Sequence, residues 1–432
     1  MKPLGLIIIA TALLLPLFWL PGIGAGRDMA ALFSQYLGLA ALIAMAISQL
    51  IATRWPGIEA AFGPLDQSYR IHKWLGIGAM VAILVHDTID ADMRGLGAET
   101  ALNDFAETAG EVSLYGLLAL VVITLITFIP YHLWKFTHCL IGVFFVLGAF
   151  HYLFILKPSA NGDPLGIYMA AICGIGLLAY LYTSAPRALR PAKTYRIDQL
   201  SPQGNALAVA MSPMGGKFRH RAGQFGFFSF TGAGLHEPHP FTISSAPKDD
   251  GVLQITVAPL GDLTSTVIKS LQTGQPVRVE GPFGHFGAPI QGPQIWIAAG
   301  VGVTPFLALA QALPKDAAPV TMIFTVRNKA EAPHLAELQA IAAAQPNFTL
   351  VLWESASEGR LTQEQIAKLT SDTIRDATVR FCGPSAMRRA LAKGLGRHGV
   401  TAKKFHYEEF EIRTGIGFRQ LISALFQRRK NT

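Results

Sequence analysis

Long apolar runs at the beginning of the chain constrain its fold more than any other feature. Almost all of these runs lie within the first 185 residues. The chain of 432 residues is 51% hydrophobic and only 15% charged, whereas roughly 25% of the residues are charged in an ordinary soluble protein. The sequence therefore predicts a membrane-embedded part that is followed by a globular, soluble part.

Six segments are long enough to cross a bilayer, whose hydrocarbon core requires about 17–25 apolar residues in a helix. They are residues 4–20, 30–52, 71–89, 112–129, 136–156 and 165–182. The first follows Lys2, as the apolar region of a secretory signal would, but no small-x-small cleavage site comes after it. We interpret it as a retained span, so the sequence predicts a six-helix transmembrane bundle.

The basic residues predict how these spans are oriented, because cytoplasmic loops are enriched in Lys and Arg. With the N-terminus inside, the inner segments hold Lys2, Arg54, Arg70, Lys73, Lys135, Arg187, Arg190, Lys193 and Arg196, and the outer loops hold Arg27, Arg94 and Lys157. Both termini are therefore expected in the cytoplasm, most naturally at a bacterial inner or plasma membrane. The acidic loop after the third span, with Asp104, Glu107 and Glu111 near its end, is expected outside.

Other compositional features exclude some classes of function. The net charge is +8, but no Lys and Arg cluster interleaves with aromatic residues in the soluble part, so a nucleic-acid partner is not expected. Cytoplasmic loops explain the basic excess better. Cys139, Cys173 and Cys382 are far apart and form no CxxC motif, which argues against a disulfide framework and an iron–sulfur site.

Four histidines in the apolar part form two matched pairs. His72 and His86 are 14 residues apart on the third expected span, so they lie roughly 21 Å apart and point the same way. His138 and His151 are 13 residues apart on the fifth, which runs in the same direction. Ionisable residues inside a membrane are functional candidates. Pairing His72 with His138 and His86 with His151 provides the ligands of two bis-His haems.

The fifth span has an angular mismatch, because 13 residues of straight helix turn His151 roughly 140° away from His138. Gly142 and Gly148 lie between them and would permit a bend or a tighter turn. The alternative is that each histidine is a core residue bonded to the backbone, which does not account for two matched pairs. His132 has no partner at its depth, so we interpret it as a structural residue of a short inner loop.

These spans resemble the ferric-reductase-like transmembrane domain that NADPH oxidases and ferric reductases share. That family pairs histidines on its third and fifth helices at these spacings. The resemblance also implies basic residues beside the inner haem that bind its propionates. The local candidates are Arg54, Arg70 and Lys73.

After Pro191 the pattern changes to short strands between Gly and Pro turns, which predicts a small antiparallel barrel. Within it, His239-Pro240-Phe241-Thr242 resembles the flavin motif of NADPH oxidases and ferredoxin-reductase-like proteins. The resemblance implies that Phe241 and Thr242 line the isoalloxazine ring of FAD, that His239 lies beside it, and that Ser244 reaches the FAD phosphates.

A second motif for the flavin is Gly261 followed by Thr264 and Ser265 at the start of an expected helix. Backbone N–H groups at a helix N-terminus suit a pyrophosphate. Either short motif alone has an ordinary turn as its alternative. Both motifs occur in order before a dinucleotide domain, which favours the interpretation as an FAD site.

An apolar strand at residues 294–299 ends in Gly300-Val301-Gly302-Val303-Thr304-Pro305, and a helical segment follows. A strand, a glycine turn and a helix start form the phosphate cradle of nucleotide domains. The third glycine of the usual motif is absent. With Pro305 at the helix start, the segment resembles the nicotinamide motif of ferredoxin-reductase-like proteins, which implies roles for Gly300, Gly302, Thr304 and Pro305.

Arg327 follows the next strand, where the 2'-phosphate of NADPH would lie, so NADPH is favoured over NADH. Arg360 would add a second charge. A solvated charge at a strand end is the alternative for Arg327.

Cys382-Gly383-Pro384 follows a later strand, and the resemblance places such a cysteine near the nicotinamide C4. The alternative is that Cys382 is a small buried residue. Phe410 resembles the C-terminal aromatic residue that covers the flavin in the family, with Phe405 as the alternative. Thr242, Cys382 and Phe410 are thus the expected catalytic residues.

The expected domains are a transmembrane domain at 1–190, a ferredoxin-reductase-like β-barrel FAD domain at 191–290, an α/β NADPH domain at 291–411 and a basic tail at 412–432. The tail places apolar residues at spacings of three and four, with Arg419, Arg428, Arg429 and Lys430 around them. It is expected either to pack on the nucleotide domain or to lie on the inner membrane surface among anionic lipids.

The expected function is electron transfer from cytosolic NADPH through FAD and two b haems to an external acceptor. Oxygen, which would give superoxide, is the first candidate acceptor. A ferric or cupric chelate is the second. A periplasmic partner protein or a quinone is the third. A plain membrane anchor for a soluble reductase does not account for the four histidines.

Overall fold

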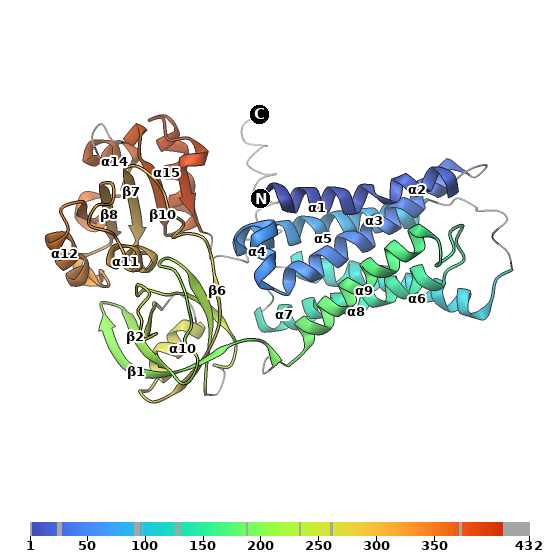
Figure 1. Ribbon diagram of the computed structural model, residues 1–432, viewed down its shortest axis with the longest axis horizontal. Helices are drawn as coiled ribbons and strands as arrows, with labels where there is room; N and C mark the ends of the chain where they lie inside the picture. The colour runs from blue at the N-terminus through green and yellow to red at the C-terminus, as the bar shows by residue number, and fades with distance from the viewer. Residues whose placement is uncertain are drawn as a thin grey trace. The chain divides into compact units, whose positions relative to one another are not determined.

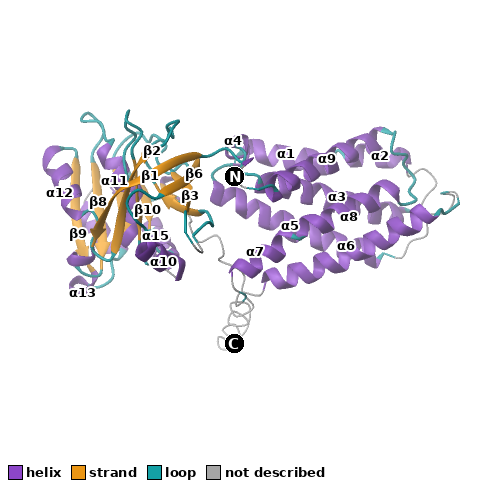
Figure 2. Cartoon of the chain, turned by 90° about the horizontal axis from the view of Figure 1, so that it is seen from below, coloured by secondary structure: helices purple, strands orange, loops and turns teal. Residues whose placement is uncertain are grey.

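The computed structural model describes residues 2–23, 28–89, 96, 98–125, 129, 131–186, 189–232, 235–259, 262–370 and 374–408. They divide into two compact units, and the division falls between Leu189 and Arg190. Unit 1 consists of long helices, and unit 2 contains the strands together with shorter helices (Figures 1 and 2). The change of pattern near Pro191 in the sequence therefore coincides with a structural boundary.

Unit 1 is a bundle in which consecutive long helices run back and forth (Figure 1). Its elements are α1 (Pro3–Leu14), α2 (Pro16–Ile23), α3 (Met29–Ala52), α4 (Pro56–Phe62), α5 (Leu65–Thr88), α6 (Ala101–Leu125), α7 (Tyr131–Cys139), α8 (Ile141–Phe154) and α9 (Pro164–Ser184). His132 lies in α7 rather than in the expected loop.

Five helical segments among the described residues are long and apolar enough to cross a membrane: Pro3–Ile23, Met29–Ala52, Ala101–Thr124, Leu133–Phe154 and Pro164–Ser184. The expected third span corresponds to α5, which has 24 residues but is not among the five. It carries Arg70 and Lys73 toward one end and Asp87 toward the other, which lowers its apolar character. Five of the six expected spans are therefore confirmed as apolar helices.

The acidic region before the fourth span is helical and not a loop, which corrects the expected boundary. Helix α6 begins at Ala101, eleven residues before the apolar run at Val112, and Asp104, Glu107 and Glu111 lie exposed on it. At its start, the backbone N–H of Thr100 donates to Asn103 Oδ1 at 2.9 Å. This short-range cap stabilises the first turn, so the helix starts before the apolar run does.

Helix α3 is the buried centre of unit 1, and it contacts α5 on one side and α9 on another. Ile43 on α3, Phe145 on α8 and Met169 on α9 are completely buried in the shared core. Gly176 on α9 lies so close that an added Cβ would come within 2.5 Å of Phe145. Small residues allow helices in a membrane to approach closely, so Gly176 permits this packing.

The first half of unit 2 is a six-stranded antiparallel sheet in the order β4-β3-β6-β1-β2-β5. The strands are β1 (Lys193–Gln203), β2 (Ala206–Pro213), β3 (Phe225–Phe230), β4 (His239–Thr242), β5 (Leu253–Val257) and β6 (Pro276–Phe283), with α10 (Asp262–Ser270) between the last two. A bridge between Ile243 and Ile255 joins the two edges of the sheet. The sheet therefore folds back on itself around an apolar core that includes Tyr195 and Phe228.

The second half of unit 2 is a five-stranded parallel sheet in the order β11-β10-β7-β8-β9. Its strands are β7 (Gln294–Ala299), β8 (Val320–Val326), β9 (Phe348–Glu354), β10 (Thr378–Cys382) and β11 (Phe405–Tyr407). The chain runs outward from β7 to β9 and then returns to the other side of β7. The carboxyl ends of β7 and β10 therefore meet at a switch point, where open α/β sheets bind ligands.

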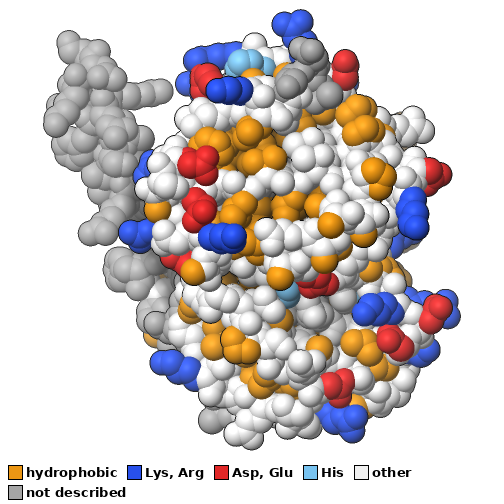
Figure 3. All heavy atoms as spheres, turned by 90° about the vertical axis from the view of Figure 1, so that its left-hand side faces the viewer, with side chains coloured by type: hydrophobic (Ala, Val, Ile, Leu, Met, Phe, Trp, Pro, Cys, Tyr) orange, Lys and Arg blue, Asp and Glu red, His pale blue; other side chains and the backbone are white. Residues whose placement is uncertain are grey.

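Helices cover both faces of this parallel sheet. They are η2 (Gly300–Val303), α11 (Thr304–Gln311), η3 (Lys329–Glu331), α12 (Leu335–Ala344), α13 (Ser355–Glu358), α14 (Gln363–Thr370), α15 (Ser385–Gly396) and η5 (Ala402–Lys404). Phe306 of α11 and Leu338 of α12 share one buried core with Trp296 of β7. Ile366 of α14 and Leu395 of α15 share the other. On the face drawn in Figure 3, acidic and basic side chains are interspersed among apolar ones.

Gly287, between β6 and β7, is expected to be essential for the stability of unit 2. A Cβ at this position would lie 1.8 Å from the carbonyl oxygen of Ala222. Gly287→Ala should therefore cost about 1–3 kcal/mol through overpacking, measured by denaturant unfolding of the full chain in detergent. Gly396→Ala is the control, because an added Cβ there meets nothing within 4 Å. Equal stability of the two variants would contradict the prediction.

Candidate cofactor sites

The four histidines of the two expected pairs all lie in unit 1. We call His72 and His138 the first rung, and His86 and His151 the second rung. In the first rung, the imidazole centroids lie 6.0 Å apart with an angle of 58° between the ring planes. In the second rung, His86 lies on α5 and His151 on α8. The structure therefore brings the two rings of the first rung together, and the pairing of the second remains a prediction.

Helix α3 supplies the hydrogen bonds of the two histidines on α5. The Nδ1 atom of His72 lies 3.0 Å from the carbonyl oxygen of Ser48, and that of His86 lies 2.9 Å from the carbonyl oxygen of Ser34. The two hydroxyl groups contact the same Nδ1 atoms, at 2.7 and 2.8 Å. A carbonyl oxygen only accepts, so Nδ1 is the donor in both rings and Nε2 carries the lone pair.

Helix α6 supplies the hydrogen bonds of the other two histidines, His138 and His151. Nδ1 of His151 donates to the carbonyl oxygen of Ala106 at 2.9 Å. Nδ1 of His138 lies 3.5 Å from the hydroxyl of Thr124, whose own proton goes to the carbonyl oxygen of Leu120. All four imidazoles are therefore held in the tautomer that leaves Nε2 free to bind a metal.

These supporting residues were not predicted from the sequence, although a signal exists for two of them. Ser34 and Ser48 are 14 residues apart, the same separation as His72 and His86 on the antiparallel helix α5. Gly110 leaves room for one of the rings, because an added Cβ there would lie 2.5 Å from Nδ1 of His151.

Part of the angular mismatch in the fifth span is relieved at Leu140. The helix is interrupted between α7 and α8, and Leu140 N–H bonds to the carbonyl oxygen of Thr137, three residues back. Such a tight turn rotates the chain by about 120° per residue, compared with about 100° in an α-helix. Gly142 and Gly148 allow close contacts with Tyr180 and Ser113.

One of the three candidate propionate ligands is linked to the first rung. The guanidinium of Arg54 donates from Nε to the hydroxyl of Tyr69 at 2.6 Å, and the Tyr69 ring lies edge-on to that of His72, with centroids 6.4 Å apart. Arg70 and Lys73 are exposed on α5 on either side of His72. The roles of all three basic residues remain predictions.

No three His, Cys, Asp or Glu side chains gather into a potential metal site anywhere in the described part of the chain. A metal held by two imidazoles alone lacks enough protein ligands. A haem fits this arrangement, because its macrocycle supplies the other ligands to the iron and the protein needs to supply only the axial ones.

The expected flavin motif forms strand β4 at an edge of the antiparallel sheet. His239, Pro240, Phe241 and Thr242 are all half-buried, so each retains accessible surface. The Phe241 ring contacts the rings of Phe228 and Phe230, with centroids 6.1 and 6.3 Å away. An edge strand with partly accessible aromatic and polar residues fits a flat ring that packs against it.

The residues expected near the FAD phosphates have mixed positions. Thr264 and Ser265 lie half-buried in the first turn of α10, as a helix-start site requires, and Gly261 lies outside the described residues. Ser244 has no accessible surface, and its hydroxyl accepts a hydrogen bond from Thr256 at 3.3 Å. Its burial leaves no room for the expected contact with a phosphate, because the hydroxyl is enclosed by the strand beside it.

The glycine turn lies at the switch point of the parallel sheet. Gly300 follows β7 with φ +54°, a conformation that favours glycine, and an added Cβ there would meet nothing within 4 Å. A Cβ on Gly302 would lie 2.3 Å from the Cys382 carbonyl oxygen, and one on Gly383 would lie 2.7 Å from Ala299. The loops after β7 and β10 are therefore in close contact, while the Cβ position of Gly300 beside them is open.

Within the turn, Thr304 is buried and donates to the carbonyl oxygen of Val301 at 3.1 Å, and Pro305 begins α11. Cys382 is also buried, and Pro384 caps α15. Burial and the nearby Glu408 raise the pKa of the Cys382 thiol to about 12. The thiol therefore stays neutral at physiological pH.

Two arginines lie beyond neighbouring strands of the same sheet. Arg327 directly follows β8 and is exposed, and Arg360 is exposed after β9 and the short helix α13. Strands β8 and β9 pair in parallel up to Val326 and Glu354. Both arginines therefore lie at the carboxyl edge of the sheet that also holds Gly300.

Of the two candidate aromatic residues for covering the flavin, the structure describes only Phe405. Phe405, the alternative flavin lid, is buried in the core and stacks on Phe381 with centroids 6.3 Å apart, so the structure contradicts that alternative. Phe410 and the tail at 412–432 lie outside the described residues. Glu408, which was not predicted, accepts hydrogen bonds from the backbone N–H groups of His285 and Phe286 at 2.8 and 3.1 Å.

Comparison with known families gives three matches in chain order. Residues 37–149 match the "ferric reductase like transmembrane component", residues 192–294 match an "FAD-binding domain", and residues 296–393 match an "oxidoreductase NAD-binding domain". The first covers most of α3, all of α5 and three of the four paired histidines. The other two divide unit 2 between its antiparallel and parallel sheets.

Each of three curated relatives is similar to this chain over less than half of the chain's length. The toluate 1,2-dioxygenase electron transfer component of Pseudomonas putida is 25% identical over 41% of this chain and 55% of its own length. An NADPH oxidoreductase of Mycobacterium tuberculosis is 25% identical over 46% and 54%. A superoxide-generating NADPH oxidase heavy chain of Dictyostelium discoideum is 30% identical over 40% and 36%. The chain thus spans about half the length of the first two relatives.

Among solved structures, the flavohemoglobin of Malassezia yamatoensis is 17% identical with a TM-score of 0.49, covering 93% of this chain and 98% of its own. The FAD/NAD-binding domain of a Vibrio cholerae nitric oxide dioxygenase is 22% identical with a TM-score of 0.46, covering 51% and 98%. The three family matches carry the assignment. With a ferric-reductase-like transmembrane component followed by FAD- and NAD-binding oxidoreductase domains, the chain matches the NADPH oxidase and ferric-reductase-like family in its domain order.

Proposed function

We propose that this chain transfers electrons across a membrane, from cytosolic NADPH through FAD and two bis-His b haems to an acceptor on the far side. Both termini and unit 2 lie on the cytoplasmic side of a bacterial inner or plasma membrane in this proposal. The excess of basic residues in the inner segments favours that orientation.

The tautomers of the four histidines carry the haem assignment. Each Nδ1 donates to a neighbouring helix, so each Nε2 presents a lone pair. An imidazole nitrogen lies about 2 Å from a metal that it binds, so two imidazoles on opposite sides of one iron have centroids roughly 6 Å apart. The 6.0 Å between His72 and His138 agrees with that value.

The residues of unit 2 would bind and orient the nucleotides. His239, Phe241 and Thr242 would hold the flavin ring at β4, and the first turn of α10 would hold its pyrophosphate. Gly300 and Gly302 would hold the pyrophosphate of NADPH, and the neutral thiol of Cys382 would lie beside the nicotinamide without placing a charge there. FAD supplies the conversion of a two-electron hydride into single electrons that haem iron accepts.

Oxygen is the acceptor that we favour. A Dictyostelium discoideum relative is named for superoxide generation. The two histidines of each rung would hold one haem, and the haems would supply single-electron transfer to oxygen. One NADPH provides two electrons, and two oxygen molecules each accept one, which yields two superoxide ions, NADP⁺ and a proton.

Two other acceptors have specific support. The exposed acidic residues Asp104, Glu107 and Glu111 at the start of α6 would attract cations, which suits a ferric or cupric chelate. The Pseudomonas putida relative is named as an electron transfer component, which suits delivery to a periplasmic protein or a quinone.

The acceptor can be identified with the purified full chain supplied with FAD and NADPH. Oxygen consumption with dye reduction that superoxide dismutase suppresses would support the oxidase function. Ferric-chelate reduction that persists without oxygen would favour the reductase. Rapid haem reduction with neither activity would point to a partner protein or a quinone.

The two rungs should hold one haem each, so a pyridine haemochrome assay should give two haems per chain. His72→Leu should leave one haem, and NADPH should no longer reduce it, because the first rung lies on the path. His86→Leu is the matched variant, and its remaining haem should still be reduced by NADPH. One haem in the unmodified chain would refute the two-rung assignment.

Arg327 should distinguish NADPH from NADH, because a guanidinium binds a phosphate strongly. A hydrogen bond to a charged group contributes about 1.5–3 kcal/mol, so Arg327→Ala should raise the KM for NADPH by roughly tenfold or more. The KM for NADH should stay nearly unchanged. Lys315→Ala serves as a control for general charge loss. Equal losses for both nucleotides would contradict this role, and Arg360 would then be tested in the same way.

A further inference from the structure

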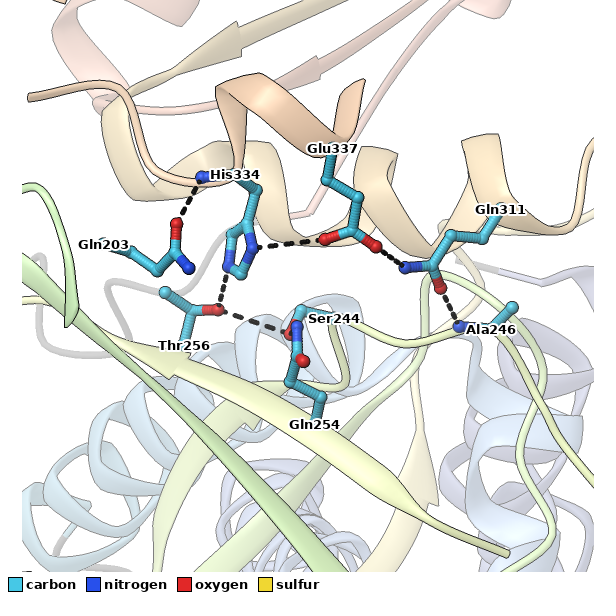
Figure 4. Close-up of polar contacts among 8 residues, drawn as sticks. All are labelled: Gln203, Ser244, Ala246, Gln254, Thr256, Gln311, His334 and Glu337. Carbon is cyan, nitrogen blue, oxygen red and sulfur yellow. Dashed lines mark hydrogen bonds and ion pairs between the residues drawn. The ribbon is translucent and has the colours of Figure 1, made fainter. Parts of the chain in front are cut away.

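A buried polar network joins the two halves of unit 2 and centres on His334 (Figure 4). His334 immediately precedes α12 and is 4% exposed. Its backbone is left-handed, with φ 59° and ψ 18°, which is uncommon for a residue other than glycine. Such a conformation persists only where surrounding contacts enforce it.

Three contacts hold His334 in place. Its backbone N–H donates to Gln203 Oε1 at 3.1 Å, at the tip of the β1–β2 hairpin. Its Nε2 lies 2.8 Å from the Thr256 hydroxyl on β5, and its Nδ1 faces Glu337 at 3.6 Å. The first two partners belong to the antiparallel sheet, so His334 connects the nucleotide half to the flavin half through both backbone and side chain.

From Thr256 the network continues to the flavin strand. The Thr256 hydroxyl donates to the hydroxyl of Ser244 at 3.3 Å. The bond between Thr256 and Nε2 of His334 takes its direction from the tautomer of the imidazole ring. Ser244 is completely buried and follows the motif His239–Thr242 by two residues.

A second bridge reaches the same segment. Glu337 on α12 accepts from Gln311 Nε2 at 2.6 Å, and Gln311 Oε1 accepts from the backbone N–H of Ala246 at 2.6 Å. The Glu337 carboxylate orients the Gln311 amide, and the bonds from His334 and Gln311 lower the pKa of Glu337. Gln311 ends α11, the helix that begins at the glycine turn.

The two bridges therefore tie the helices α11 and α12 to Ser244 and Ala246, directly after the flavin motif. We propose that His334 is a positioning residue that fixes the nicotinamide-binding turn relative to the flavin strand, and thereby sets the geometry of hydride transfer. The proposal rests on the proposed use of NADPH and FAD. It also gives Ser244 a role other than phosphate binding.

The test measures anaerobic flavin reduction by NADPH in the full chain in detergent, using stopped-flow absorbance. His334→Asn keeps a residue that tolerates the left-handed backbone but is too short to hold both neighbours. Thr256→Val removes the hydroxyl at nearly constant shape, and Thr256→Ser restores it. We expect the limiting rate of flavin reduction to fall at least tenfold in His334→Asn and Thr256→Val, because small misplacements cost orders of magnitude in rate.

A purely structural role would change FAD content or unfolding temperature without changing the rate in FAD-loaded protein. The Kd for NADPH should stay within about twofold of the unmodified value, the charge-transfer absorbance between nicotinamide and flavin should weaken, and Thr256→Ser should recover most of the rate. If His334→Asn does not fold, Thr256→Val and Thr256→Ser decide the question alone.

Unchanged rates in the variants that load FAD, or a loss confined to NADPH affinity, would overturn the role of His334. An equal defect in Thr256→Ser and Thr256→Val would overturn it as well. Failure of NADPH and NADH to reduce the flavin of the unmodified chain would instead refute the proposed function, so the two failures are distinguishable.

Discussion

The interaction on which unit 1 depends is the hydrogen bond from each buried imidazole Nδ1 to a neighbouring helix. In a bilayer core, an unsatisfied polar group costs several kcal/mol. Carbonyl groups of α3 and α6 meet this requirement for three of the histidines, and Thr124 meets it for the fourth. The bonds that make these histidines tolerable in an apolar environment also choose their tautomer. Helix packing and ligand chemistry thus have the same origin here.

Unit 2 is organised by a different constraint, the return of the chain across β7. Because β10 lies beside β7 and not beyond β9, the loops after β7 and β10 meet, and glycine at positions 302 and 383 lets them touch. The sheet order therefore creates the nucleotide site, and the polar contacts around His334 relate that site to the flavin strand. The covalent connection between the halves is supplemented by contacts far apart in sequence.

Much of this organisation was predictable from local signals. Apolar runs predicted six spans, of which five are confirmed as apolar helices, and the Gly300 turn predicted its strand and helix. Features that depend on contacts distant in sequence were not predicted. The burial of Ser244 depends on β5 beside it, and the roles of Ser34 and Ser48 depend on the antiparallel packing of α3 against α5. The start of α6 was missed for another reason. Its first three turns are amphipathic and begin at a cap formed by Thr100, and a search for continuous apolar runs detects neither feature.

The interruption at Leu140 has a consequence for how such a bundle can vary. In a continuous helix, the number of residues between two ligands fixes both their separation along the axis and their relative rotation. A joint between two helical segments makes these two quantities independent. The spacing of 13 residues on one helix can then match the spacing of 14 on the other. The interruption at Leu140 changes the rotation of His151 relative to His138. The other side chains of α8 are then constrained only by packing against neighbouring helices.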